Sequence, residues 1–341
     1  MMQSFALAYL TFPAWLRPEI IKGLPLRWYG LMYLVAFAIA YFLFRYQVRE
    51  KKLPVSNDEV MNYFFWIIIG LLLGARIIAT TVYDPTGRYI RRPWLIFWPF
   101  DENMRFTGLA GMSYHGGLIG VIVATIVYCR VKKRSFLEWA DLIVTAVPLG
   151  YTFGRLGNFI NGELYGRVTA SPLGMVFPLA RRFSTGEAWV REIAAKAGMV
   201  ITEDQTSINL PRHPSQLYEA FFEGIVLWIV MWFIFRKREL VRGTKFGIYL
   251  IGYGVFRFFI EYVREPDIGI GYPISFSKLD NPTYLLVTPW NFTTGQILNF
   301  LMILGGIILI LAVRSRSKKK AALPPASKKR LSSRRLKKKI R

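Results

Sequence analysis

The hydrophobic residues of this chain are gathered into long runs, and short polar segments separate them. Each run is long enough for a helix to cross the hydrocarbon core of a bilayer, which takes about 20 residues. The runs do not alternate in polarity as the strands of a membrane barrel do, and a helix satisfies its own backbone hydrogen bonds in lipid. The pattern predicts about seven transmembrane helices, at residues 24–44, 60–82, 109–129, 136–153, 216–235, 246–263 and 295–313.

The polar segments indicate how these helices are oriented. The segments after the first, third, fifth and seventh predicted helices are rich in Lys and Arg, and the positive-inside rule places such segments in the cytoplasm. The N-terminus then lies outside and the C-terminus in the cytoplasm. Of the outer segments, residues 156–214 are long enough for a small extracytoplasmic head. The predicted fold class is therefore an all-α polytopic membrane protein, whose membrane domain with its head occupies residues 1–313.

Charge adds a tail to this picture. The chain has a formal net charge of +24, and 14 of its 45 Lys and Arg residues lie in residues 314–341, which contain no Asp or Glu. Such a basic segment without apolar periodicity is typical of disorder, and its expected partner is an anionic membrane surface. RNA binding is the weaker alternative for the tail, so no nucleic-acid partner is expected.

The sequence offers few groups for metal or nucleotide chemistry. Cys129 is the single cysteine, and the two histidines are His115 and His213. This composition excludes an intrachain disulfide and a multi-cysteine metal site. The motifs of phosphate-binding loops, zinc proteases and serine hydrolases do not occur. Nucleotide hydrolysis, zinc proteolysis and a serine-hydrolase elbow therefore lack their usual signals, and we interpret Cys129 as a packing residue.

Polar side chains inside the predicted helices gather at one depth. The predicted topology places them in the outer half of the bilayer: Tyr29, Arg76, His115, Arg155, Glu219, Arg257 and Glu261. An arginine inside a membrane costs roughly 2.5–3.5 kcal/mol on insertion scales, so it is usually buried and paired. Six predicted helices contribute to this level, which favours a functional site. Arg76 is equally well explained as structural.

The predicted helix at 246–263 has the clearest polar pattern. Tyr253, Arg257, Glu261 and Arg264 are spaced four, four and three residues apart, which puts them on one helix face. A structural ion pair between Arg257 and Glu261 explains this pattern as well as function does, when it is taken alone. Arg155 at the same depth favours function, because two guanidinium groups suit an anion such as phosphate.

His115 is the candidate for proton transfer. A histidine accepts protons near neutral pH, and the two glycines that follow it allow a ligand or another helix to approach closely. The competing interpretation is a histidine that bonds a neighbouring carbonyl. Tyr29 is ordinarily explained as an interfacial anchor, and its polar neighbours raise it to a site candidate.

Five motifs together resemble one family. RWYGLMY, HGGLIG, GRLGNFINGELYGR, HPSQLYEA and YGVFRFFIEYVREPD, in this order, resemble the bacterial prolipoprotein diacylglyceryl transferases over roughly residues 24–313. The resemblance implies a multi-pass enzyme of the bacterial inner membrane whose active site faces the outer leaflet. It implies transfer of the diacylglyceryl group of phosphatidylglycerol to the lipobox cysteine of a preprolipoprotein signal peptide. The resemblance also implies that a thioether and glycerol 1-phosphate are the products, that neither a metal nor a cofactor is required, and that this is the first step of lipoprotein maturation.

The resemblance also assigns residues. It implies that Arg155 binds phosphatidylglycerol, and the family's other motif positions match Tyr29, His115, Asn158, Tyr253, Arg257 and Glu261. We hypothesise that Arg155 and Arg257 clamp the phosphate, with Asn158 and Asn161 as hydrogen-bonding surroundings. His115 would accept the thiol proton, although the field of the arginines alone is an alternative means of forming the thiolate. Three rival functions are an anion or lipid transporter, another headgroup transferase that uses phosphatidylglycerol, and a non-catalytic lipid-binding scaffold. The missing inverted repeat argues against the transporter.

Overall fold

The computed structural model describes residues 9–23, 26–100, 104–105, 111–266, 271–276, 284–286 and 288–322. These residues are mostly helical, and five helices among them have the length and apolar composition to cross a membrane. They are α1 (Trp28–Glu50), α2 (Asn57–Thr81), α4 (Tyr114–Val131), the continuous helix Ser215–Phe235, and Thr294–Lys318 of α11 (Thr294–Ala322). The expectation of a polytopic membrane protein is confirmed.

Two of the predicted helices differ from this description. In place of one helix at 136–153, the chain forms α5 (Phe136–Ile143) and α6 (Val147–Ile160), with a turn at 144–146 between them. Pro148 lies in the first turn of α6, where its missing N–H interrupts no hydrogen bond, whereas in a continuous helix it would remove one. Helix α10 (Thr244–Ile260) is unbroken, but with 17 residues it is shorter than each of the five helices above. The count of seven membrane crossings therefore stays a prediction.

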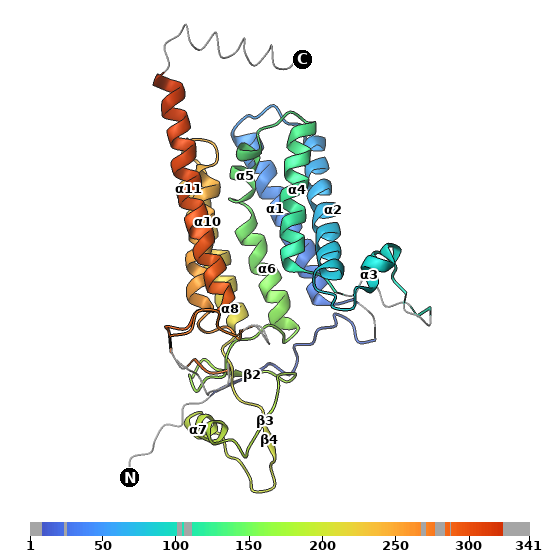
Figure 1. Ribbon diagram of the computed structural model, residues 1–341, viewed down its shortest axis with the longest axis vertical. Coiled ribbons are helices and arrows are strands. Elements are labelled where there is room, and N and C mark those ends of the chain that lie inside the picture. The colour runs from blue at the N-terminus through green and yellow to red at the C-terminus, as the bar shows by residue number, and fades with distance from the viewer. Residues whose placement is uncertain are drawn as a thin grey trace. The chain divides into compact units, whose positions relative to one another are not determined.

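The chain divides into two compact units, residues 41–143 and residues 1–40 with 144–341. In unit 41–143, α2 and α4 pack side by side through glycines on both helices (Figure 1). A Cβ on Gly120 would lie 1.9 Å from the carbonyl oxygen of Gly70, and one on Gly116 would lie 2.3 Å from that of Gly74. Gly116, which directly follows His115, thus serves helix packing, as small residues do between membrane helices.

Unit 41–143 is completed by aromatic side chains and two short elements. Phe44, Tyr63, Tyr128 and Trp139 form its buried aromatic core. The segment after α2 forms the short helix α3 (Arg88–Arg91) and the 3₁₀ turn η1 (Pro93–Ile96).

The other unit holds the first part of α1, α6, the helix Ser215–Phe235, α10 and α11. The helix Ser215–Phe235 begins as α8 (Ser215–Glu219), continues as the π-helix η2 (Ala220–Val226), and ends as α9 (Leu227–Ile229) and the π-helix η3 (Val230–Phe235). Helices α10 and α11 run side by side (Figure 1). Helix α6 packs against η2, where a Cβ on Gly224 would lie 2.1 Å from the Thr152 hydroxyl oxygen.

The predicted head segment, residues 156–214, contains short strands as well as a helix, and a strand from the N-terminal part of the chain pairs with it. Strand β1 (Leu10–Thr11) pairs in parallel with β2 (Met175–Val176), and β3 (Phe183–Ser184) pairs antiparallel with β4 (Ser207–Ile208) beside α7 (Ala188–Lys196) (Figure 1). The apolar side chains of this segment form their own small core: Val168, Phe183, Val190, Ala194, Ile208 and Leu210. The all-α class is therefore corrected to a mostly helical one, because strand pairs satisfy part of the backbone outside the helices.

Helix α11 also changes the boundary of the basic tail. It continues past residue 313 to Ala322, and the disorder of the tail stays a prediction. The rest of the predicted tail, residues 323–341, lies outside the described residues.

Candidate active site

In the unit that contains α6, α8 and α10, polar side chains on three helices are spaced about one helical turn apart. Tyr151 and Arg155 lie one turn apart on α6, and Arg257 lies on α10. Glu219 ends α8, and Glu223 lies one turn later in η2. Residues four apart share a helix face, so each helix presents its pair in one direction. Gly224 has no side chain, and this allows η2 to approach α6 closely.

Glu219 holds two arginines with one oxygen. Its Oε2 lies 2.8 Å from Arg155 Nε and 2.8 Å from Arg257 Nη1. The Glu219 side chain is 0% exposed, while those of Arg155 and Arg257 are 13% and 10% exposed. A buried carboxylate is tolerated only when its charge is compensated, and here two guanidinium groups do so. Glu219 therefore sets where both arginines point.

Tyr151 links Glu219 to a second buried carboxyl group. Its hydroxyl donates to Glu223 Oε2 at 2.5 Å, and Glu219 Oε2 lies 3.2 Å away on the same hydroxyl. Arg155 Nε donates to the Tyr151 oxygen at 2.7 Å. Because a hydroxyl has one hydrogen, it serves one carboxylate at a time. Glu223 Oε1 lies 3.8 Å from Arg257 Nη1, a longer contact than either contact of Glu219.

The end of α10 contributes a further ion pair. Arg257 Nη2 lies 3.4 Å from Glu261 Oε2, and Arg264 Nη1 lies 3.8 Å from the same oxygen. The Thr293 hydroxyl donates to Glu261 Oε1 at 3.2 Å. The ion pair expected from the spacing of these residues is thus present. The ring of Tyr253 packs edge-on against Tyr151 at a centroid distance of 5.9 Å, which puts Tyr253 at the margin of the cluster.

A chain of amides leads from Arg155 to the loop after α6. Arg155 Nη1 donates to Asn158 Oδ1 at 3.4 Å, and Asn158 Nδ2 donates to Glu163 Oε1 at 3.1 Å. Asn161 Nδ2 donates to the same Glu163 oxygen at 3.1 Å. Both predicted asparagines are therefore brought to one carboxylate that the sequence interpretation did not assign.

The loop that carries Glu163 has an unusual backbone. Gly162 has a φ of 66° and Leu164 a φ of 57°, and a left-handed φ is uncommon for a side chain as large as leucine. The loop is held by α8, because Gln216 Nε2 donates to the Glu163 carbonyl at 2.7 Å and the Ser215 hydroxyl to that of Leu164 at 3.1 Å. Backbone strain of this kind persists only where the surroundings fix it, and it concentrates at functional sites.

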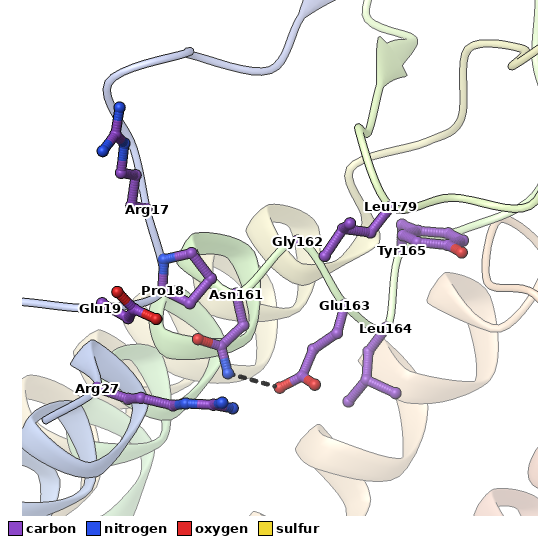
Figure 2. A pocket seen from close by; sticks show the side chains of 10 residues that line it. All are labelled: Arg17, Pro18, Glu19, Arg27, Asn161, Gly162, Glu163, Leu164, Tyr165 and Leu179. Carbon is purple, nitrogen blue, oxygen red and sulfur yellow. Dashed lines mark hydrogen bonds between the residues drawn. The ribbon is translucent and has the colours of Figure 1, made fainter. Parts of the chain in front are cut away.

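A pocket of about 610 Å³ opens beside this loop. Figure 2 shows its lining side chains, and Arg27 extends toward Asn161 and Glu163. The wall combines charges of both signs with apolar groups: Arg17, Pro18, Glu19, Arg27, Asn161, Gly162, Glu163, Leu164, Tyr165 and Leu179. Such a lining suits a ligand that has both an anionic and a hydroxyl-bearing part.

Tyr29 lies against α6. A Cβ on Gly157 would lie 3.4 Å from the Tyr29 ring, so the glycine makes room for the tyrosine next to Asn158. The Tyr29 hydroxyl donates to that of Tyr33 at 3.0 Å. This contact places Tyr29 beside the helix that carries Arg155 and Asn158.

His115 belongs to unit 41–143, whereas the residues of the preceding paragraphs belong to the other unit. It is the second residue of α4, it is exposed, and its Nδ1 lies 3.2 Å from the Tyr83 hydroxyl. In the same unit Arg76 donates from Nε to the Ile96 carbonyl at 2.5 Å and from Nη1 to that of Gly111 at 3.3 Å. Arg76 is 4% exposed, and these bonds are those of a structural residue.

His213 is the other histidine, and its contacts are structural. Its backbone accepts from the N–H of Gly166 at 2.8 Å and donates to the carbonyl of Arg167 at 3.0 Å. Burial lowers the pKa of the His213 imidazole below its usual value. The side chain is therefore neutral at pH 7 and is suited to packing.

The structure thus brings most of the predicted residues together. Those in the unit that contains α6 are Tyr29, Arg155, Asn158, Asn161, Tyr253, Arg257 and Glu261. Sequence reasoning assigned no role to Tyr151, Glu163, Glu219 or Glu223. The available signal was the spacing of four residues inside apolar runs, Tyr151 to Arg155 and Glu219 to Glu223. Within the described ranges, no group of His, Cys, Asp and Glu is arranged to hold a metal ion.

Comparison with known proteins shows which protein family this chain resembles. Residues 18–312 match the family model described as prolipoprotein diacylglyceryl transferase. Among similar proteins are three named phosphatidylglycerol–prolipoprotein diacylglyceryl transferase. The one from Treponema denticola is 51% identical over 325 residues, which cover 91% of this chain and 96% of the relative. That of Treponema pallidum is 50% identical over 311 residues, 87% of this chain and 93% of the relative. That of Chlorobaculum tepidum is 41% identical over 326 residues, 93% and 96% of the two chains.

Proposed function

Because the chain belongs to the prolipoprotein diacylglyceryl transferase family, whose reaction begins lipoprotein maturation, we propose a specific donor, acceptor and site for it. The chain is a multi-pass enzyme of the cytoplasmic membrane that transfers diacylglyceryl groups. The proposed donor is phosphatidylglycerol of the outer leaflet, and the acceptor is the lipobox cysteine thiol of a preprolipoprotein. The thiolate sulfur attacks the carbon of the diacylglyceryl group that carries the phosphate, and the bond between that carbon and the phosphate oxygen breaks. A thioether forms and glycerol 1-phosphate leaves.

The placement of two arginines on one buried carboxylate supports this reaction most strongly. Glu219 Oε2 lies 2.8 Å from each of Arg155 and Arg257, whose side chains are 13% and 10% exposed. A guanidinium has five N–H donors, so these contacts leave donors for a phosphate. Two such groups match a phosphodiester in charge and geometry. They also stabilise the negative charge that grows on the leaving phosphate, which is the main requirement of the transition state.

The headgroup has a candidate place beside the clamp. Glu163 and Asn161 line the pocket of Figure 2, and Asn158 connects Glu163 to Arg155. A carboxylate accepts hydrogen bonds from hydroxyl groups, so Glu163 is suited to the two free hydroxyls of the phosphatidylglycerol headgroup. The phosphate would then lie toward Arg155, and the headgroup glycerol would lie in the pocket.

Formation of the thiolate is the second requirement, because the thiolate is the nucleophile. We assign the thiol proton to His115, whose Nδ1 contact with the Tyr83 hydroxyl leaves Nε2 for the substrate. The alternative is that the positive field of the arginines lowers the pKa of the substrate thiol without a base. Cys129 takes no part, since it is buried near the C-terminal end of α4.

The proposed orientation has seven crossings, with the N-terminus outside. Besides the five long helices, α5 with α6 and the 17-residue α10 would supply the other two. Single cysteines placed after each helix in a Cys129→Ala background would test it. An impermeant thiol reagent added to intact cells should label only the predicted outer segments.

One assay tests the function. Purified protein in detergent receives phosphatidylglycerol with labelled acyl chains and a peptide that contains a lipobox cysteine. Label should move to this peptide and not to a peptide with serine in place of cysteine. Release of glycerol phosphate without a labelled peptide would instead indicate another headgroup transferase. Binding of the lipid with neither product would indicate a scaffold or a transporter.

A further inference from the structure

The carboxyl group of Glu223 is a buried titratable group that the proposed reaction leaves without a role. It lies in the π-helix η2, about one turn after Glu219, and it is 1% exposed. π-Helical turns are rare and are frequent at functional sites. The close contact of Gly224 with Thr152 fixes η2 against α6, the helix that carries Tyr151. A carboxyl group in this position requires a reason, because burial of an anion is costly.

The groups that face Glu223 come from three elements. From α6, the Tyr151 hydroxyl donates to it at 2.5 Å, and the charge of Arg155 on the same helix also acts on it. From α10, Arg257 Nη1 lies 3.8 Å away. On its own helix, Glu219 competes for the same Tyr151 hydroxyl at 3.2 Å. Two carboxylates that share one hydroxyl hydrogen resist being charged at the same time.

A count of charges shows what a bound phosphate would require. The cluster contains three arginines and three glutamates: Arg155, Arg257, Arg264, Glu219, Glu223 and Glu261. With all of them ionised its net charge is zero. A phosphodiester anion would then add an uncompensated negative charge at a site of low dielectric constant, which is strongly unfavourable. A single proton on one carboxylate restores neutrality.

The contacts indicate which carboxylate takes that proton. Glu219 has guanidinium nitrogens at 2.8 Å from two arginines, so its anion is strongly stabilised. Glu261 contacts two arginines, at 3.4 and 3.8 Å, and accepts a hydrogen bond from Thr293. Among the described contacts, Glu223 has one ion pair, with Arg257 Nη1 at 3.8 Å, beside the hydrogen bond that it accepts from the neutral Tyr151 hydroxyl at 2.5 Å. The anion of Glu223 is therefore held least.

We propose that Glu223 takes up one proton when the phosphodiester of phosphatidylglycerol binds to Arg155 and Arg257. The inference rests on the proposed function. The proton comes from water, the carboxylate becomes a carboxylic acid, and no covalent bond of the lipid changes in this step. The Glu223 carboxylic acid then donates to the Tyr151 oxygen, and the Tyr151 hydroxyl donates to the carboxylate of Glu219. When the anionic product leaves, the proton returns to water.

Linkage gives the sign of the pH effect. If binding takes up a proton, the affinity for phosphatidylglycerol falls as the pH rises, by up to about tenfold per pH unit. The phosphodiester itself remains ionised over the same range, so it contributes no slope. Lipid affinity measured at equilibrium without peptide isolates this step from proton transfer at the thiol.

The test compares the wild-type protein with Glu223→Gln, which has the shape of the protonated side chain. The dissociation constant of phosphatidylglycerol in detergent micelles should rise between pH 6 and 9 for the wild type and stay flat for Glu223→Gln, with the variant binding more tightly at pH 9. Glu192→Gln is the matched control, because Glu192 is an exposed carboxylate paired with Lys196 at 2.6 Å in α7. It should follow the wild type. Equal slopes for the wild type and Glu223→Gln would overturn the proposal.

A direct count of protons provides a second measurement. In weakly buffered detergent with a pH indicator, the wild type should take up about one proton per bound lipid. Should Glu223→Gln fail to fold, the absence of proton uptake by the wild type would still refute the coupling. The labelled-lipid assay separates the two hypotheses. Without transfer to the lipobox peptide, the proposed function fails; with transfer but no proton uptake, the role of Glu223 alone fails.

Discussion

Arg76 of α2 is bonded to backbone carbonyl oxygens, whereas Arg155 and Arg257 of the other unit are bonded to carboxylates. Arg76 is 4% exposed and donates to Ile96 and Gly111. Arg155 and Arg257 meet at Glu219, next to a second carboxyl group. The two carbonyl contacts of Arg76 tie α2 to the segments around Ile96 and Gly111, whereas Glu219 both positions Arg155 and Arg257 and balances part of their charge. The described contacts of these arginines thus differ in what they hold together.

The two units also use glycine differently. Between α2 and α4, glycines face glycines, and the two backbones nearly touch at Gly120 and Gly70. Between α6 and η2, Gly224 faces the side chain of Thr152, and the neighbouring residues Glu223 and Tyr151 are hydrogen-bonded to each other. The first arrangement makes a tight, apolar helix pair. The second keeps two helices close while polar side chains remain between them.

The largest effect is expected from the arginines. Arg257→Ala should lower transfer by at least about 10³-fold, because it removes a phosphate ligand and a partner of buried Glu219. Arg76→Ala should reduce the amount of folded protein and leave the rate per folded molecule within about threefold, if Arg76 is structural. Labelled-lipid transfer, normalised to monodisperse protein in detergent, measures both. Near-normal transfer by Arg257→Ala would remove it from the phosphate clamp.

Glu219→Gln is the next test, since it keeps the size of the side chain and removes its charge. Both arginines lose their shared anchor, and we expect transfer to fall about a hundredfold, or about 2.7 kcal/mol. Glu219→Asp keeps the charge and should recover part of the rate. A Gln variant as active as the wild type would show that the arginines are positioned by other contacts.

The sequence predicted the parts of the site that lie on one helix. The face of α10 with Arg257 and Glu261 follows from spacing alone, because an α-helix has a fixed period. The membrane character follows from the length of the apolar runs. The predicted continuous helix at 136–153 was wrong, although Pro148 was visible, because proline is tolerated in many membrane helices.

Contacts between helices could not be predicted from the sequence. Glu219 was noticed as polar, but its role depends on Arg155 and Arg257 arriving from α6 and α10. Glu223 lies in a π-helix, whose altered period no simple helical pattern anticipates. The glycine after His115 was interpreted as room for a ligand or a helix, and packing against Gly74 decided between them.

His115→Gln tests whether unit 41–143 contributes chemistry. We expect the turnover rate at pH 7 to fall about 10²-fold, the lower end for loss of a general base. Higher pH should restore part of it, because more of the substrate thiol is then ionised. Tyr83→Phe, which removes the contact at 3.2 Å, should have a smaller effect in the same direction. Without recovery at high pH, His115 orients the substrate and is not the base.

The glycine contrast is tested by stability. Gly120→Ala would bring its Cβ within 1.9 Å of the Gly70 carbonyl oxygen, and Gly224→Ala within 2.1 Å of the Thr152 hydroxyl. Each should destabilise the protein by about 1–3 kcal/mol, as overpacking does. Gly154→Ala is the matched control on α6, since no described atom outside its own stretch of helix backbone lies within 4 Å of the added Cβ. Thermal unfolding in one detergent compares the three. A Gly120 variant as stable as Gly154→Ala would contradict the tight pairing of α2 and α4.

The smallest effect is expected from the end of the chain. Deletion of residues 323–341 removes nine Lys and Arg residues but keeps all of α11, which ends at Ala322. Because the charge-balanced cluster lies on α6, η2 and α10, transfer in neutral detergent should stay within about twofold of the full chain. On vesicles with anionic lipids the deletion should weaken attachment of the basic segment, since each Lys or Arg near such a surface contributes about 1 kcal/mol. A tenfold loss in detergent would mean that the tail takes part in the reaction itself.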